Sequence, residues 1–182
     1  MSDLRWAVVA SRELGDADRS ALRELWDDAF GERFSDDDAD HAFGGVHVIA
    51  RDDEGRPVAH ASAVPRRLRV GETWFEAAYV EAVAVARARR RQGLGTIAME
   101  LLADQIAAGW PFAMLSTGSH GFYERLGWRR WAGRSLTRRA DGAEEFDDEH
   151  GGLMVLVPDG VPVPGLDLTL DVVCEDRAGD AW

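Results

Sequence analysis

Hydrophobic residues recur along the chain with alternating periods, and these periods predict the order of helices and strands. Segment 5–10, RWAVVA, is typical of a strand. Helical spacing follows in a set of apolar residues: Leu22, Leu25, Trp26, Ala29 and Phe30. This set predicts an amphipathic helix with one face in the core. A short second helix is expected to begin at Ser35 or Asp36 and to end at the Gly-Gly pair 44–45.

Three extended segments come next, and short polar turns join them. The segments cover residues 46–52, 57–70 and 74–86. The turns, DEGR at 53–56 and GET at 71–73, are typical of hairpins. Together they predict an antiparallel meander.

Another helix signal opens the second half of the chain. Apolar residues again lie at helical spacing: Leu94, Ile97, Ala98, Leu101, Leu102 and Ile106. A helix is therefore expected to begin close to Gly93. FAMLST at 112–117 predicts a buried strand, and GFYERLG at 121–127 predicts a short helix stopped by Gly127.

The rest of the chain predicts strands and one acidic loop. The strands are expected at 128–136, 152–158 and 166–173, and the loop, DGAEEFDDEH, at 141–150. We find no internal repeat, low-complexity tract or linker in the sequence. The economical prediction is a single α+β domain over residues 1–182.

Composition limits the possible functions. No apolar run reaches the roughly 18 residues that span a bilayer, and the amino-terminal segment is too charged for a secretory signal, so a cytoplasmic protein without a membrane partner is expected. Cys174 is the only cysteine, which excludes an intramolecular disulfide and disfavours a cysteine-based zinc site.

The charge pattern narrows the choice of partner. A net charge of −12 argues against a nucleic-acid backbone and is compatible with a cationic small molecule, although an acidic surface also serves solubility alone. All 21 basic residues are arginine. The lack of lysine excludes Walker-type phosphate loops, pyridoxal Schiff bases and lysine nucleophiles.

An arginine-rich stretch and two glycines precede the second long helix. Gly93 and Gly95 lack side chains where helical N–H groups have no intrahelical partner, so an anion can approach the backbone closely. Arginines stand just before them, at positions 87, 89, 90 and 91. These features predict phosphate binding. The alternative is a solvated arginine-rich turn with capping glycines.

Three nucleotide motifs compete for this stretch. The Walker motif fails for want of Gly-Lys-Ser/Thr. GLGTIA at 93–98 matches the dinucleotide fingerprint, but seven residues separate Val85 from Gly93, and the next strand does not end in an acidic residue. The third candidate is the pyrophosphate arm of coenzyme A.

Segment 80–99, VEAVAVARARRRQGLGTIAM, resembles the acyl-CoA-binding segment of the GNAT acetyltransferase superfamily. Its signature, Arg/Gln-x-x-Gly-x-Gly/Ala, fits RRQGLG at 90–95. The resemblance implies a mixed, mostly antiparallel central sheet flanked by about four helices. It also implies acetyl-CoA as co-substrate, no metal, and a set of binding residues: Val83, Ala84, Val85, Arg90, Arg91, Gln92, Gly93, Leu94, Gly95 and Thr96.

Four blocks resemble a narrower family, the aminoglycoside 2'-N-acetyltransferases. They lie in order at 38–47, 79–85, 122–128 and 174–182. This resemblance implies acetylation of a 2'-amino group by direct transfer in a ternary complex, and a homodimer. Two alternatives stay open: a GNAT enzyme for another amine, such as a polyamine or a kasugamycin-like antibiotic, and a non-catalytic acyl-CoA sensor.

The same resemblance implies two catalytic residues. Glu81 matches the general base, which acts through a water molecule, and the alternative is a carboxylate that only hydrogen-bonds the drug. Tyr123 matches the general acid beside the sulfur, and the alternative is a core aromatic residue. Backbone N–H groups of Val83 and Val85 would face the thioester carbonyl and pantetheine.

Substrate contacts follow from the resemblance as well. The matching residues are Asp38, Glu81, Ala82, Ser116, Asp180 and the carboxylate end of Trp182. Ordinary packing or a dimer contact would explain Trp182 nearly as well. The family has a further aspartate where this chain has Gly151, and Glu149 is the candidate replacement, which puts the substrate in doubt and leaves kasugamycin conceivable.

Overall fold

A computed structural model describes residues 4–146, 151–160 and 162–182. The chain forms two compact units. Unit 1 consists of Met1–Val64 and Val80–Gln105, and unit 2 consists of Pro65–Tyr79 and Ile106–Trp182. The long strands β3 (Pro57–Val70) and β4 (Thr73–Val85) run through both units.

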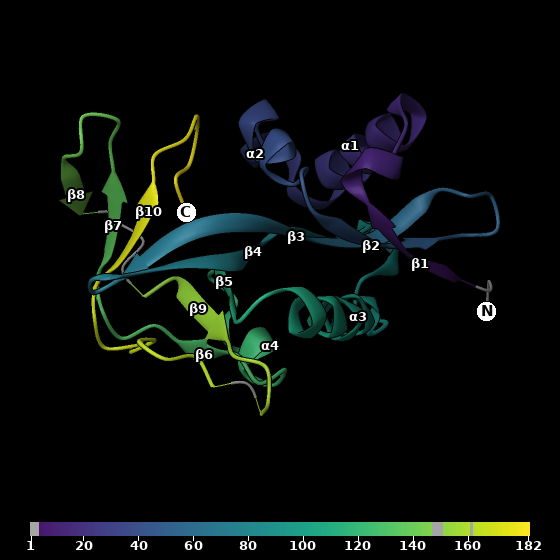
Figure 1. The fold of residues 1–182 in the computed structure, drawn as a ribbon. Coiled ribbons are helices and arrows are strands. Elements are labelled where there is room, and N and C mark those ends of the chain that lie inside the picture. Colours follow the sequence, from purple (N-terminus) through teal and green to yellow (C-terminus); the bar gives the residue numbers. More distant parts are fainter. Residues whose placement is uncertain (1–3, 147–150, 161) are drawn as a thin grey trace. The chain divides into compact units, whose positions relative to one another are not determined.

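Unit 1 is a small antiparallel sheet with helices on both faces. Its elements, besides parts of β3 and β4, are β1 (Arg5–Ala10), η1 (Ser11–Glu13), α1 (Asp16–Phe30), η2 (Gly31–Arg33), α2 (Asp36–His41), β2 (Val46–Arg51), η3 (Arg87–Arg89) and most of α3 (Leu94–Gly109), which passes into unit 2 at Ile106. Strand β2 pairs antiparallel with both β1 and β3. Helices α1 and α2 lie on one side of these strands and α3 lies on the other (Figure 1).

The apolar face of α1 forms the core of unit 1. Leu22, Leu25 and Trp26 are buried in one cluster with Ile49 of β2 and Ala84 of β4. The helical spacing of the apolar residues therefore predicted both the helix and its buried face.

Unit 2 contains the remaining strands and one short helix. They are β5 (Ala113–Ser116), α4 (His120–Glu124), β6 (Arg129–Arg130), β7 (Ser135–Arg138), β8 (Glu144–Phe146), β9 (Leu153–Leu156) and β10 (Val172–Glu175). The strand order is β6-β9-β5-β4-β3-β10-β7-β8. The pairs β4/β5 and β7/β10 are parallel, whereas β5/β9, β6/β9, β3/β10 and β7/β8 are antiparallel. The predicted α+β class with a mixed, mostly antiparallel sheet is confirmed.

The prediction of one strand over 128–136 is wrong, because the chain turns away in the middle of this segment. β6 pairs with β9, while β7 pairs with β10 and β8. At Gly133 the backbone passes so close to Leu170 that a Cβ atom would lie 1.7 Å from the Leu170 carbonyl oxygen. The Trp131 indole donates to the same oxygen over 3.0 Å. Contacts distant in sequence thus divide the segment.

Two further predictions need correction. Residues 166–171 alternate like a strand but are irregular, with a turn at 168–169, because the Asp167 carboxylate accepts hydrogen bonds from the backbone N–H and hydroxyl of Thr169. Strand β10 begins only at Val172. Helix α2 ends at His41, before the two glycines. Gly45 instead permits a close approach of strands, since a Cβ there would lie 1.9 Å from the Ala63 oxygen.

The acidic segment 141–150 also differs from the expected loop, because Glu144–Phe146 forms β8 against β7. Residues 147–150 lie outside the described part of the chain.

None of the helices in the described ranges has the length and apolar character needed to cross a membrane.

Candidate active site

The start of α3 in unit 1 is an open backbone loop. Arg91 and Gly93 have positive φ angles of 61° and 79°, and both residues are exposed together with Gln92 between them. The bond from the Ile97 N–H to the Gly93 oxygen spans 3.1 Å and begins the helix, so the N–H groups before Ile97 have no partner inside it. A Cβ on Gly93 would meet open space. The loop can therefore receive an anion.

Two arginines before this loop are tied to the end of α1. Arg90 donates from Nη2 to the Ala29 carbonyl over 2.7 Å, and the Arg87 backbone N–H donates to Asp28 Oδ2 over 2.7 Å. Arg90 thus has a structural partner besides its predicted role toward coenzyme A. The Arg91 side chain is exposed beside the positive-φ backbone.

Strand β4 carries Glu81 beside a kink. Ala82 has a φ of 51°, in the left-handed region, which costs a non-glycine residue roughly 1–2 kcal/mol. Side chains of β3 hold the carbonyls on this kink: Ser62 donates to the Glu81 oxygen over 3.1 Å, and His60 Nδ1 lies 2.8 Å from the Ala82 oxygen. Alternation along the strand is broken here, since Glu81, Ala82 and Val83 are all half-buried.

The other residues predicted to bind acetyl-CoA follow along unit 1. Ala84 is buried in the core and Val85 is half-buried, so the prediction for both concerns the backbone. Leu94 is buried at the first turn of α3, and Gly95 and Thr96 are half-buried in that turn. All ten predicted positions therefore lie on β4, the following loop or the start of α3.

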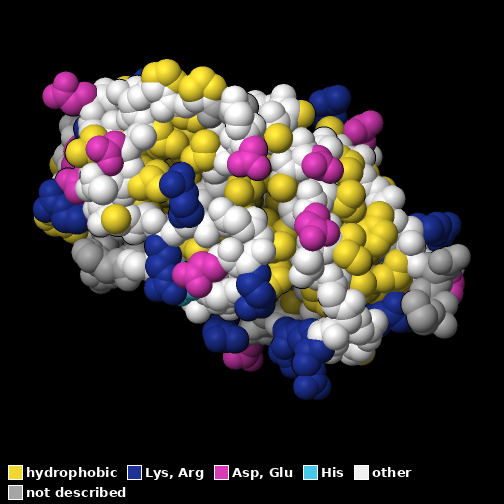
Figure 2. All heavy atoms as spheres, turned by 90° about the horizontal axis from the view of Figure 1, so that it is seen from below, with side chains coloured by type: hydrophobic (Ala, Val, Ile, Leu, Met, Phe, Trp, Pro, Cys, Tyr) yellow, Lys and Arg dark blue, Asp and Glu magenta, His cyan; other side chains and the backbone are white. Residues whose placement is uncertain are grey.

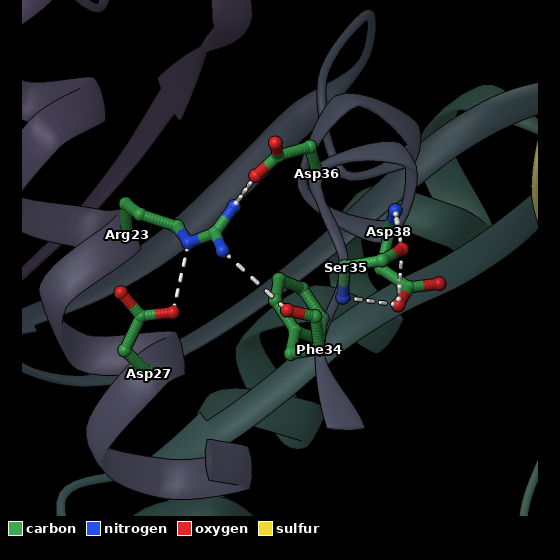
Figure 3. A network of polar contacts seen from close by, with 6 residues as sticks. All are labelled: Arg23, Asp27, Phe34, Ser35, Asp36 and Asp38. Carbon is green, nitrogen blue, oxygen red and sulfur yellow. Dashed lines mark hydrogen bonds and ion pairs between the residues drawn. The ribbon is translucent and has the colours of Figure 1, made fainter. Parts of the chain in front are cut away.

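The predicted substrate residue Asp38 lies at the start of α2, where it closes a capping box (Figure 3). Its Oδ2 accepts from the Ser35 backbone N–H over 2.7 Å and from the Ser35 hydroxyl over 2.8 Å, while its own N–H donates to Ser35 Oγ over 3.1 Å. Nearby, Arg23 joins Asp27 and Asp36 over 2.8 and 2.6 Å. The two bonds from Ser35 fix the Asp38 carboxylate in one orientation.

Tyr123 lies in unit 2, on α4, with 8% of its surface exposed. Phe122 and Trp128 pack edge-on against its ring at centroid distances of 4.9 and 5.9 Å. Burial raises the pKa of the Tyr123 hydroxyl to about 12. The hydroxyl is therefore protonated at neutral pH, as a proton donor must be. Tyr123 is also a core aromatic residue, so the two predicted roles are compatible.

Two more predicted substrate residues lie near the end of the chain in unit 2. Asp180 lines a pocket of about 340 Å³ whose other charged residues are Arg139, Glu145 and Asp176. Trp182 is 4% exposed, its backbone N–H donates to Asp180 Oδ1 over 3.1 Å, and its ring lies 6.4 Å from that of Tyr79. Ser116 is the last residue of β5 and is half-buried. Glu149 lies outside the described residues.

Sequence analysis missed the groups that support the β4 kink. His47 on β2 and His60 on β3 are fully buried, and burial lowers their pKa values to about 4 and about 3. Their one signal in the sequence is histidine within otherwise apolar strands. Such a pattern does not show which carbonyl a buried histidine contacts.

Figure 2 shows acidic, basic and hydrophobic side chains together on one face. The loop before α3 is a local concentration of arginine in an acidic chain.

Comparison with known proteins agrees with this geometry. The model of the acetyltransferase (GNAT) domain family matches residues 10–131, which include β4, the loop and the start of α3. An aminoglycoside 2'-N-acetyltransferase of Mycolicibacterium fortuitum is 34% identical over 178 residues, covering 96% of this chain and 90% of that protein. The chain belongs to the GNAT acetyltransferase family.

Solved GNAT structures share the fold. A GNAT family N-acetyltransferase from Escherichia coli, in complex with CoA, matches with a TM-score of 0.68 and 20% identity, covering 97% of this chain and 95% of that chain. A GNAT acetyltransferase from Brucella melitensis in complex with acetyl-CoA matches with a TM-score of 0.60 and 18% identity, covering 92% and 94%. The predicted GNAT fold is therefore confirmed.

Proposed function

We propose that this GNAT acetyltransferase transfers the acetyl group of acetyl-CoA to the 2'-amino group of aminoglycosides, by direct transfer in a ternary complex. The observation that carries the proposal is the 34% identity over nearly the whole chain to a protein named for this reaction. We also propose that residues 1–182 form one GNAT domain and that the protein is a cytoplasmic homodimer that uses no metal.

The loop before α3 fits the pyrophosphate of coenzyme A. Its residues Arg91, Gln92 and Gly93 are exposed, its N–H groups at the helix start are unpaired within the helix, and Gly93 leaves room for a ligand oxygen. Arginine adds charged donors of the geometry that phosphate accepts. Bound acetyl-CoA supplies an acetyl thioester, and the residues of β4 would lie along its pantetheine arm.

Glu81 is proposed as the general base. Ammonium groups on sugars must lose a proton before they attack a thioester, and a positioned carboxylate acting through water contributes roughly 10²- to 10⁴-fold. Glu81 precedes and Val83 follows Ala82, whose φ of 51° bends the strand. That N–H would donate to the oxygen on which negative charge develops.

Tyr123 is proposed to hold the proton that the departing sulfur takes. A tyrosine hydroxyl is protonated in the neutral range, and burial extends that range by raising the pKa of Tyr123 to about 12. We propose the following substrate contacts: Asp38, Ala82, Ser116, Asp180, Trp182 and Glu149. Carboxylates suit a substrate that carries several ammonium groups, and those at 145, 176 and 180 share one pocket of unit 2.

A pair of drugs tests the reaction and its position. Tobramycin has a 2'-amine and amikacin has a 2'-hydroxyl, so the purified protein should consume acetyl-CoA with tobramycin and not with amikacin. Turnover with kasugamycin alone would contradict the proposed substrate but keep the acetyltransferase chemistry. Binding of CoA without turnover on any amine would contradict catalysis altogether and favour a sensor.

The variant Glu81→Gln tests the base. It should lower kcat for tobramycin by about 100-fold or more, because the amide cannot accept the proton, while acetyl-CoA binding measured by calorimetry stays within about twofold. Glu76→Gln, an exposed glutamate of the same strand in unit 2, is the matched control. Equal turnover of Glu81→Gln and wild type would remove the general-base assignment.

A further inference from the structure

A row of buried polar side chains crosses unit 1 and ends at the β4 kink. Ser11 Oγ lies 2.6 Å from His47 Nε2, and His47 Nδ1 lies 3.0 Å from His60 Nε2. His60 Nδ1 in turn lies 2.8 Å from the carbonyl oxygen of Ala82. Ser11 and both histidines are buried, which makes unmade hydrogen bonds costly there.

The contacts at the two ends favour one direction for these hydrogen bonds. The Ala82 oxygen can only accept, so its 2.8 Å contact with His60 Nδ1 is a hydrogen bond when Nδ1 carries a hydrogen. A neutral His60 then accepts at Nε2 from His47 Nδ1–H, and a neutral His47 accepts at Nε2 from the Ser11 hydroxyl. Burial keeps both rings neutral by lowering their pKa values.

The Ser11 end is consistent with this direction. Ser11 Oγ lies 2.9 Å from the Gly44 nitrogen and 3.1 Å from the Gly45 nitrogen, so the oxygen accepts from two backbone N–H groups while its own hydrogen goes to His47. The opposite direction would direct a lone pair of His60 at the Ala82 oxygen. One contact favours the opposite direction, because Trp26 Nε1 lies 3.2 Å from His60 Nδ1 and can donate only to a lone pair there. The Ala82 contact is shorter, at 2.8 Å, and it agrees with the Ser11 end of the row.

We propose that Ser11, His47 and His60 are positioning residues, whose chain of hydrogen bonds holds the left-handed backbone at Ala82 and thereby orients Glu81 and the Val83 N–H. This inference rests on the proposed function of Glu81. None of the three side chains needs to touch a substrate, because each acts through the Ala82 carbonyl. Ser62, which donates to the Glu81 carbonyl, supports the same kink from a neighbouring position of β3.

The first test measures the tautomers and needs no substrate. Long-range ¹H–¹⁵N NMR of the wild-type protein should show His47 and His60 neutral at pH 7, both with hydrogen on Nδ1. Hydrogen on Nε2 of His60 would overturn the proposal, because the Ala82 carbonyl would then receive no hydrogen bond from the ring.

The second test compares His60→Leu with His60→Asn. Leucine removes the donor, whereas the asparagine amide can take the place of Nδ1–H and donate to the same carbonyl. We expect His60→Leu to lower kcat by about 10- to 100-fold with KM for acetyl-CoA within about twofold, since small displacements of catalytic groups have effects of this size. His60→Asn should restore kcat to within about threefold of wild type.

Ser11→Ala and Val48→Ala complete the design. Ser11→Ala removes the hydrogen bond at the far end of the row and should lower kcat severalfold. This variant also tests the proposal if His60→Leu does not fold. Val48→Ala removes buried volume next to His47 on β2 and should reduce stability with unchanged kcat per folded protein.

Unchanged kcat in both folded His60→Leu and Ser11→Ala would overturn the proposal. A wild-type protein inactive on tobramycin would instead overturn the proposed function, and this is seen before any variant is compared.

Discussion

Helices α2 and α3 both begin in unit 1, but only α2 has side chains of its own that cap its first N–H groups. At α2, Ser35 and Asp38 satisfy each other's backbone N–H groups in a capping box within the helix itself (Figure 3). At α3, the preceding residues are Arg91, Gln92 and Gly93, which offer no carboxylate or hydroxyl to the first turn. The N–H groups before Ile97 have no partner within the helix, and the loop with its positive-φ backbone is exposed.

The difference separates a helix start that its own side chains close from one that we propose binds an anion. An N-terminus closed by its own side chains contributes to stability, whereas one preceded by glycine and arginine gives up that contribution and gains anion affinity. Changes at α3 should therefore affect acetyl-CoA binding, and changes at α2 should affect stability.

The largest effect is expected for Gly93→Asp. The new carboxylate would cap the α3 start and repel a phosphate, and the positive φ adds strain, so acetyl-CoA affinity should fall about 100-fold or more, equivalent to about 2.7 kcal/mol. Calorimetric titration measures this. Gly55→Asp is a matched control, because Gly55 has a φ of 82° and equally open surroundings in the β2–β3 turn. An equal loss in both variants would show that strain alone is responsible.

A smaller effect is expected for Arg91→Gln. Removal of one exposed guanidinium should raise KM for acetyl-CoA about 5- to 10-fold at low salt, and the difference from wild type should shrink at high salt because exposed charges are screened. Steady-state kinetics at two ionic strengths measures both quantities. Arg33→Gln changes another exposed arginine of unit 1 and should leave KM unchanged. A KM for Arg91→Gln equal to that of wild type would remove Arg91 from the anion site.

The smallest effect is expected for Ser35→Ala at the closed start of α2. Loss of the cap should lower the free energy of unfolding by about 1 kcal/mol, with acetyl-CoA affinity unchanged. Urea denaturation and calorimetry measure the two quantities. Ser20→Ala on the surface of α1 is the control and should change neither. A loss of acetyl-CoA affinity in Ser35→Ala would contradict the division of roles between the two helices.

The sequence predicted both helix starts because their signals are local. A serine followed three residues later by aspartate, and a glycine pair behind arginines, are readable without tertiary contacts. The kink at Ala82 was not predictable, because alanine is no turn residue and the conformation is held by side chains of another strand. The division of segment 128–136 at Gly133 likewise depends on Leu170, far along the chain.

The most direct measurement compares the binding of acetyl-CoA with that of S-acetylpantetheine, which lacks the pyrophosphate and nucleotide. If the α3 start holds the pyrophosphate, wild type should bind acetyl-CoA at least about 100-fold more tightly, equivalent to about 2.7 kcal/mol. This advantage should disappear in Gly93→Asp and persist in Ser35→Ala. Equal affinities of the two thioesters for wild type, or an advantage retained in full by Gly93→Asp, would contradict the assignment of the α3 start to acetyl-CoA.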